Sequence, residues 1–289
     1  MSDYNLTENL QWTKRLNQEK VDEIYLKHFG KDYRYYRKLW NKAGMDFLPD
    51  FPIHIDFELA DACNLRCAHC FRNEEISKRM GLDINRGTRL PLDVFKRIIK
   101  EGRANGLLAV NFGFSGECLL NDHLIEMINI AGKSSILDIR LITNGTLMTE
   151  GIIDRLLESA LTFLSFSIDA GREESYRRLK GRDFFKQLEG LVDYAYRRKK
   201  KLKKDLPLTR ASFYSAPENE NDKDLFLEKF QNKVDFIDFQ KFHDMRKKRA
   251  REIKTNCRAP FQRLAVFANG DVSPCCTFFS KKIIVGNVN

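Results

Sequence analysis

Long apolar runs are absent from this chain of 289 residues. A helix that crosses a membrane needs about 18 or more apolar residues in succession, so we expect no membrane partner. Residues 1–8 also lack the basic stretch and the following apolar stretch of a secretory signal. These two absences predict a cytoplasmic protein, whose cysteines meet a reducing environment.

Short-period repeats and low-complexity linkers are missing as well. Their absence excludes a repeat array and gives no sign of a long flexible connection. What is present is the composition of an ordinary globular protein, with 43% hydrophobic and 31% charged residues. The length accommodates one large α/β domain and a small additional one.

Basic residues outnumber acidic ones, and the formal net charge is +10. Much of the excess lies in two runs, 197–204 and 246–251. Such runs can bind nucleic acid, a membrane surface or an acidic substrate. Neither run is interleaved with aromatic residues, as a base-stacking surface requires. We therefore expect solvated helix faces or loops and no nucleic-acid partner.

Three of the seven cysteines, Cys63, Cys67 and Cys70, have the spacing CxxxCxxC and follow the apolar run 53–60. In a reducing compartment, clustered cysteines are more often metal ligands than disulfides. An iron–sulfur cube is usually held by four thiolates, so three would leave one iron open to a small molecule. The alternative is a structural zinc site with His69 as the fourth ligand.

From residue 53 onward, strand patterns alternate with helical patterns. The expected strands are 53–59, 107–114, 136–143, 163–168, 208–214 and 234–239. This order predicts an α/β fold with a parallel sheet, and its number of strand–helix units suits a partial (β/α)6 TIM-like barrel. Ligands of such folds bind at the carboxyl ends of the strands.

The helical patterns divide into a leader and the barrel helices. In the leader, residues 1–50, the stretch 21–45 predicts one or two amphipathic helices that end near Gly44. The leader is either a helix packed on the outside of the core or a substrate-recognition element. The barrel helices are expected to begin near Pro91, Asp122 and Thr149, and to cover 184–196 and 222–230.

Polar residues follow the expected strands at their carboxyl ends. Ser115, Gly116 and Glu117 follow the second strand, and Asn144 lies in a Thr-Asn-Gly turn after the third. Ser167 and Asp169 follow in the same way at the end of the fourth strand. Each of these motifs alone would be an ordinary turn or a solvated carboxylate, so their order behind the clustered cysteines carries the information.

The cysteine spacing and the ordered strand-end motifs resemble the radical S-adenosylmethionine (radical SAM) family over residues 51–289. The resemblance implies that Cys63, Cys67 and Cys70 are the catalytic centre and hold a [4Fe–4S] cluster. It also implies that the free iron binds SAM, and that an electron from the cluster cleaves SAM to a 5′-deoxyadenosyl radical. An electron donor such as flavodoxin or ferredoxin is then expected.

The same resemblance implies contacts with SAM. Residues 114–118 resemble the family's GGEP motif, with Ser115 in place of the first glycine and Cys118 in place of the proline. Glu117 would then accept a hydrogen bond from the SAM ammonium group, and Ser167 would contact the ribose. His69 takes a place that is often aromatic in the family and that packs beside the adenine.

The SAM carboxylate is paired in many relatives with an arginine just before a glycine. This chain has Lys180 before Gly181, with Arg177 and Arg178 nearby, so the cation that makes the pair stays open. The expected cofactor-binding residues are His69, Ser115, Gly116, Glu117, Asn144, Ser167, Asp169, Arg178 and Lys180.

The C-terminal segment predicts a β-hairpin, 263–268 and 271–275, with a type I′ turn at Asn269-Gly270. Cys257, Gly270 and Cys275 have a pattern that resembles the opening of a SPASM or twitch extension, which implies an auxiliary iron–sulfur cluster. Its expected metal ligands are Cys257, Cys275 and Cys276.

These three cysteines are fewer than the usual four ligands. The module is therefore cut short, or its cluster has an open iron or a partner's ligand, or it is a relic. Cys118 is a doubtful fourth ligand and suits a small buried side chain better. The expected domains are the leader 1–50, the core 51–245 and a partial SPASM or twitch module 246–289.

These features predict a radical SAM oxidoreductase that takes a hydrogen atom from its substrate. We expect a small molecule such as a sugar or amino-sugar, because an auxiliary cluster suits an oxidation by accepting the second electron. The alternatives are an enzyme that modifies a peptide or protein, an RNA-modifying enzyme that uses the basic runs, and a non-catalytic iron–sulfur protein.

Overall fold

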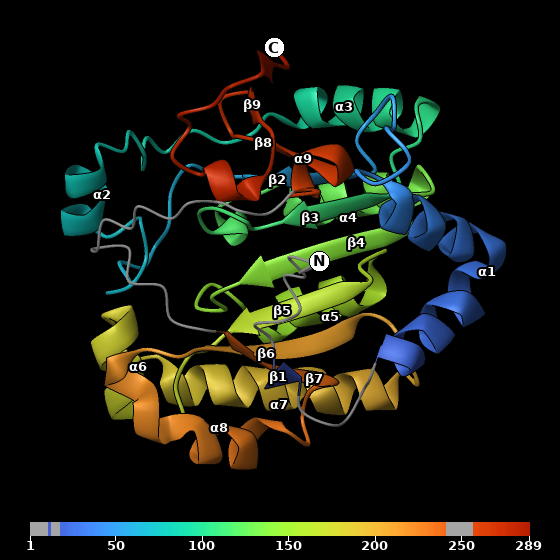
Figure 1. The fold of residues 1–289 in the computed structure, drawn as a ribbon. Helices are drawn as coiled ribbons and strands as arrows, with labels where there is room; N and C mark the ends of the chain where they lie inside the picture. The colour runs from blue at the N-terminus through green and yellow to red at the C-terminus, as the bar shows by residue number, and fades with distance from the viewer. Residues whose placement is uncertain (1–10, 13–17, 241–256) are drawn as a thin grey trace.

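The computed structural model describes residues 11–12, 18–240 and 257–289. Within them, one sheet has the strand order β1-β7-β6-β5-β4-β3-β2-β8-β9-β10 (Figure 1). The barrel strands are β2 (His54–Phe57), β3 (Ala109–Phe112), β4 (Asp138–Thr143), β5 (Phe163–Ser167), β6 (Leu208–Tyr214) and β7 (Phe236–Gln240). All neighbouring pairs from β2 to β7 are parallel. The predicted α/β fold with a partial barrel is confirmed.

Helices follow most of the barrel strands. The described helices are α1 (Gln18–Lys42), α2 (Glu74–Met80), α3 (Leu92–Ala104), α4 (Leu124–Lys133), α5 (Glu150–Glu158), α6 (Glu173–Lys180), α7 (Phe185–Lys201), α8 (Lys223–Phe230) and α9 (Ala259–Gln262). The predicted start of α5 is confirmed, since the Thr149 side chain accepts a hydrogen bond from the backbone N–H of Ile152 at 3.2 Å. The short helices α2 and α6 were not predicted.

The two faces of the barrel sheet have opposite chemistry. Successive side chains of a strand point to opposite faces. One face is apolar and belongs to the main buried core, with Phe57, Phe112 and Leu164 among its residues. The helices α3, α4, α5 and α7 lie behind this face (Figure 1). The alternate residues line the inner face and are largely polar: His54, Asp56, Asn111, Asp138, Arg140, Ser165, Arg210 and Asp238.

The helix α1 packs against the amino-terminal ends of the barrel strands. It has one break, at Gly30, whose φ of 53° is left-handed. The hydroxyls of Tyr25 and Tyr36 donate to the two oxygens of Asp138 at 3.1 and 3.5 Å. Both tyrosine side chains are buried. The leader therefore supplies part of the core.

The C-terminal segment adds β8 (Arg263–Val266), β9 (Asp271–Ser273) and β10 (Gly286–Asn287) to the same sheet. The predicted hairpin is confirmed, since β8 and β9 pair antiparallel. The type I′ turn was wrong, because Gly270 has a positive φ of 88° and Asn269 does not, whereas a type I′ turn needs two such residues. The turn is closed instead by Gly270 N–H donating to the Phe267 carbonyl at 2.9 Å.

The first strand of this hairpin is also a barrel strand, since β8 lies parallel to β2. The proposed boundary between residues 245 and 246 and the basic run 246–251 lie outside the described residues. The other basic run begins at the end of α7, where Arg198 pairs with Asp154 at 2.8 Å and Lys199 with Asp235 at 2.6 Å. No described helix is long and apolar enough to cross a membrane.

Candidate functional site

The loop after β2 brings Cys63, Cys67 and Cys70 together at the carboxyl end of the sheet. The loop is fixed by backbone bonds, with Cys70 N–H donating to the Cys67 carbonyl at 3.0 Å and Ala68 N–H to the Leu179 carbonyl at 2.8 Å. Two further donors reach sulfur atoms. The Arg72 N–H lies 3.5 Å from Cys70 Sγ, and the Asn144 amide nitrogen lies 3.8 Å from Cys63 Sγ. Hydrogen bonds to sulfur are one means of setting the potential of an iron–sulfur cluster.

The described side chains give no support to the alternative of a structural zinc site. Among the residues that the structure describes, no three His, Cys, Asp or Glu side chains converge on one metal position. Tetrahedral zinc requires such convergence, whereas a cube takes one thiolate on each iron. Burial raises the pKa of all three thiols, that of Cys67 to about 12, so iron would have to displace their protons.

The His69 ring stacks on Tyr214, with the ring centroids 4.7 Å apart. Its Nδ1 is buried without a hydrogen-bond partner, and burial lowers the pKa of His69 to about 4. The imidazole is thus a neutral aromatic surface at the edge of the cysteine loop. Its expected place beside the adenine stays a prediction.

A buried arginine that we did not predict lies two residues after Cys70. The Arg72 guanidinium is 2% exposed and donates to Glu58 at 2.6 Å, to Asp61 at 2.9 Å and to Ser115 at 2.8 Å. Ser115 in turn donates to Glu58 at 2.7 Å. The serine that replaces the first glycine of the motif is therefore part of an ionic cluster beneath the cysteine loop.

The same cluster is joined to the C-terminal segment. The second oxygen of Glu58 accepts from the backbone N–H of Ala268 at 3.2 Å, and Lys281 lies 4.0 Å from Asp61. Beside them, the rings of Phe71 and Phe279 stack at 4.1 Å. The cysteine loop and the C-terminal module therefore share one set of buried contacts.

The backbone at Gly116 comes very close to the start of the cysteine loop. Its φ is 72°, and a Cβ atom there would lie 2.1 Å from the Ala60 carbonyl oxygen. Only glycine fits this position. The neighbouring Glu117 N–H donates to the Ala62 carbonyl at 2.8 Å. The strand-end motif after β3 thus packs directly against the start of the cysteine loop and is hydrogen-bonded to it.

The Glu117 residue is 2% exposed, and its carboxylate accepts hydrogen bonds from neighbouring groups of the chain. Its donors include the Thr143 hydroxyl at 2.7 Å, the Asn144 N–H at 2.9 Å and the Leu119 N–H at 3.2 Å. Cys118 also donates to it at 3.4 Å and is buried. Glu117 therefore joins the ends of β3 and β4, and its direct contact with the SAM ammonium group stays a prediction.

The Asn144 side chain connects the β4 turn to the cysteine loop, since it donates to Asn64 Oδ1 at 3.0 Å and points to Cys63. Ser167 is half-buried at the end of β5. The structure thus places Asn144 beside the loop and Ser167 on the next strand, at the level where SAM would bind.

Lys180 and Asp169 form a buried ion pair, each less than 5% exposed. Burial alone would lower the pKa of Lys180, but the Asp169 charge outweighs it and raises the pKa. Arg178 instead points outward and donates to the Glu218 carbonyl at 3.1 Å. Of the two expected cations, Lys180 therefore lies nearer the cysteine loop, where its charge partly offsets the rise that burial causes in the pKa of Cys67.

The inner face also carries an ion pair between β6 and β7 that we did not predict. Arg210 Nη1 lies 3.1 Å from Asp238 Oδ2, and Gln240 donates to the same oxygen at 3.0 Å. Arg210 also donates to Ser165 at 2.9 Å. Burial raises the pKa of Asp238 and lowers that of Arg210. The alternation of polar and apolar residues along β6 and β7 was the available sequence signal.

The three C-terminal cysteines differ in their exposure. Cys257 is exposed, Cys275 is buried and Cys276 is partly buried. Burial raises the pKa of Cys276 to about 12, and the neighbouring Asp56 charge adds to this effect. Their role as metal ligands stays a prediction.

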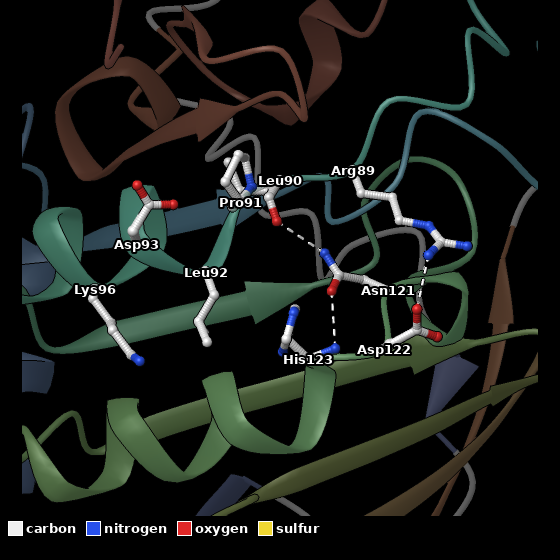
Figure 2. Close-up of a pocket in the computed structure, with 9 residues that line it drawn as sticks. All are labelled: Arg89, Leu90, Pro91, Leu92, Asp93, Lys96, Asn121, Asp122 and His123. Atoms are coloured by element: carbon white, nitrogen blue, oxygen red, sulfur yellow. Dashed lines mark hydrogen bonds and ion pairs between the residues drawn. The ribbon is translucent and has the colours of Figure 1, made fainter.

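A pocket of about 510 Å³ lies at the amino-terminal ends of α3 and α4 (Figure 2). Its nine lining residues are Arg89, Leu90, Pro91, Leu92, Asp93, Lys96, Asn121, Asp122 and His123. They include none of the expected site residues, and Arg89 is paired with Asp122 at 2.8 Å. The pocket therefore gives no candidate for the SAM site.

Comparison with known proteins agrees with this geometry. The chain belongs to the radical SAM superfamily, whose family model matches residues 57–225. Within it, this is a radical SAM enzyme of the SPASM type, since residues 257–289 match the SPASM iron–sulfur cluster-binding domain. Its cofactors are accordingly a [4Fe–4S] cluster and SAM, and the SPASM domain implies an auxiliary iron–sulfur cluster.

Individual relatives cover different parts of the chain. GTP 3′,8-cyclase of Alkaliphilus metalliredigens is 32% identical over 142 residues, which are 48% of this chain and 42% of that enzyme. This chain thus matches less than half the length of that curated relative.

Two solved structures show the same fold. SuiB of Streptococcus suis, bound to its precursor peptide SuiA, aligns with a TM-score of 0.63 and 15% identity, and covers 90% of this chain and 67% of its own. BtrN in complex with AdoMet and 2-DOIA aligns with a TM-score of 0.51 and 15% identity, and covers 83% and 80%.

Proposed function

We propose that this chain is an oxidoreductase that removes a hydrogen atom from a small polar molecule, such as a sugar or amino-sugar. The observation that supports this is the inner face of the sheet, where every strand from β2 to β7 carries at least one polar side chain. Buried polar groups need hydrogen-bonding partners. Most polar side chains of this face bond one another, but Asn111 Oδ1 and Asp238 Oδ1 have no partner among the described residues, and a hydrophilic ligand would supply one.

Two sets of residues would have separate roles, one in holding the cluster and the other in binding SAM. Cys63, Cys67 and Cys70 would hold the cluster, while Asn144 and the Arg72 backbone hold the sulfur atoms in place. When bound, the cluster and SAM supply an organic radical that takes hydrogen from the substrate.

The second set would bind and orient SAM. Lys180 is the proposed partner of the SAM carboxylate, and Glu117 of its ammonium group. Ser167 is proposed to contact the ribose, and His69 to cover the adenine. The contribution of these residues is position and exclusion of water. An electron donor such as flavodoxin or ferredoxin is part of this proposal.

A peptide substrate is the second candidate. It is supported by the fold likeness to SuiB, whose structure contains a precursor peptide. A nucleotide substrate has support of a similar kind, from the partial match to GTP 3′,8-cyclases.

Deuterium transfer tests the proposal. The anaerobically reconstituted protein is incubated with SAM, a reductant and carbon-deuterated sugars or amino-sugars. We expect 5′-deoxyadenosine that carries deuterium from one of them. Transfer only from a labelled peptide would contradict the small-molecule proposal, and failure to cleave SAM at all would contradict the enzyme assignment.

A further inference from the structure

Asp238 has an unused hydrogen-bonding atom on the inner face of the barrel. The residue is fully buried, and its Oδ2 accepts from both Arg210 and Gln240. Its Oδ1 has no partner among the described residues. Arg210 is held in turn by Ser165. The carboxylate is therefore fixed in orientation, with one oxygen left to accept a hydrogen bond.

The strand register places this oxygen at the level of the expected SAM contacts. Thr143 is paired with Phe166, so the following residues, Asn144 and Ser167, lie side by side. Ser167 is paired with Ser212, and Ser212 with Asp238. One row across β5, β6 and β7 thus leads from the ribose-binding position to Asp238. A group bound at Asp238 would lie beside SAM, at the carboxyl end of the sheet.

The charge around Asp238 selects among possible donors. A carboxylate accepts hydrogen bonds and offers none, so its ligand must be a donor such as a hydroxyl or an ammonium group. The Asp238 charge is already neutralised by Arg210 at 3.1 Å. An ammonium group would add an uncompensated buried charge, which is costly, whereas a hydroxyl adds none.

From these observations we infer that Asp238, held by Arg210, binds a hydroxyl group of the substrate and positions it beside SAM. The ligand class is a polyhydroxylated small molecule, whose charged group, where it has one, lies away from Asp238. This inference rests on the proposed function and deepens it, because it names the substrate group and the residue that selects it.

The test uses Asp238→Asn in the full-length, anaerobically reconstituted enzyme. The probes are carbon-deuterated glucose, glucosamine, inositol and glycerol, and the readout is the fraction of 5′-deoxyadenosine that carries deuterium. Losing a hydrogen bond to a charged group costs about ten- to a hundredfold in affinity. We therefore expect the KM for the transferring probe to rise by that factor, more than the KM for SAM.

Asp154→Asn is the matched control, because Asp154 also pairs with an arginine, Arg198 at 2.8 Å, but on the outer helices. It should transfer deuterium as the unchanged enzyme does. Thermal unfolding shows whether each variant is folded. If Asp238→Asn does not fold, Arg210→Lys replaces it, since lysine keeps the charge but not the planar geometry, and it should raise the same KM.

The outcomes distinguish a failure of the Asp238 inference from a failure of the proposed function on which it rests. Unchanged KM values for a transferred probe in folded Asp238→Asn, or in Arg210→Lys where that variant replaces it, would overturn the role of Asp238 and leave the enzyme assignment intact. SAM cleavage without deuterium transfer from any of the four probes would overturn the polyhydroxylated substrate. No SAM cleavage by the unchanged enzyme would overturn the proposed function itself.

Discussion

Two groups of three cysteines lie in the segments that flank strands of one sheet, and they differ in how they are held. Cys63, Cys67 and Cys70 share one short loop, and donors from Asn144 and the Arg72 backbone reach two of their sulfur atoms. In the C-terminal group, Cys257 is exposed whereas Cys275 is only 3% exposed. The first group is positioned by local chain geometry and by neighbouring strand ends. In the second group, Cys257 precedes the hairpin whereas Cys275 and Cys276 follow it, so we expect its metal binding to depend more on the cluster itself.

The most severe test of this difference is Cys67→Ala. Removing one of three thiolates should abolish the cluster of the first group, because three protein ligands are already one fewer than the usual four. We expect no 5′-deoxyadenosine from SAM, while circular dichroism shows a folded protein. The control is Cys118→Ala, which removes a buried thiol outside both groups and should keep the loop cluster. SAM cleavage by Cys67→Ala at the unchanged rate would refute the central assignment.

The second test isolates the C-terminal group. A protein with alanine at Cys63, Cys67 and Cys70 should still hold about four iron atoms after reconstitution if the module carries a cube. Adding Cys275→Ala should then remove this iron. Iron and sulfide analysis decides the matter, and a triple variant without any iron would make the C-terminal module a structural element only.

The contacts between the two groups can be tested at Arg72. Arg72→Gln leaves Glu58 and Asp61 buried without their cation. Breaking a buried ion pair costs about 3–5 kcal/mol, which corresponds to a fall in the thermal midpoint on the order of 10 °C for a chain of this size. Calorimetry of the protein without metal measures this.

Arg178→Gln is the matched control for Arg72, because Arg178 is exposed and its partners are a backbone carbonyl and the exposed Glu174 at 3.9 Å. Its midpoint should stay within about 2 °C of the unchanged protein, as surface substitutions usually do. Equal midpoints for the two variants would show that the Arg72 cluster does not join the modules.

The smallest expected effect concerns Glu117 beside the first group. Glu117→Gln keeps the shape but removes the negative charge that the SAM ammonium group would meet. We expect SAM affinity to fall about tenfold or more by equilibrium binding to the reconstituted protein. An unchanged affinity would leave Glu117 with the role that its contacts already describe, joining the ends of β3 and β4.

The sequence was sufficient for the barrel, because alternating apolar strands and helices with short connections admit few arrangements. Even the end of β6 at Tyr214 and the Thr149 cap were predicted correctly. The residues of the expected site lie at strand ends, which a parallel sheet places at one edge whatever the details of packing.

What escaped prediction depends on contacts between distant segments. Arg72 and Glu58 are 14 positions apart, and neither belongs to a motif, so only folding shows that they meet. The pair of Arg210 and Asp238 joins β6 and β7, and the sequence of either strand alone does not predict the register between them. The turn at Asn269-Gly270 failed for a local reason, since the same dipeptide also serves at the end of a turn, where only Gly270 needs a positive φ.

The packing of α1 has a consequence for protein engineering. Its Tyr25 and Tyr36 hold Asp138, and its carboxyl-terminal carbonyl at Trp40 accepts from Arg258 and Gln262 of the C-terminal module. A shortened version that begins at residue 51 would expose the amino-terminal ends of the barrel strands. It would also remove the hydrogen bonds that Arg258 and Gln262, just before β8, make to α1. Fusion partners and affinity tags are therefore better placed before this helix than in exchange for it.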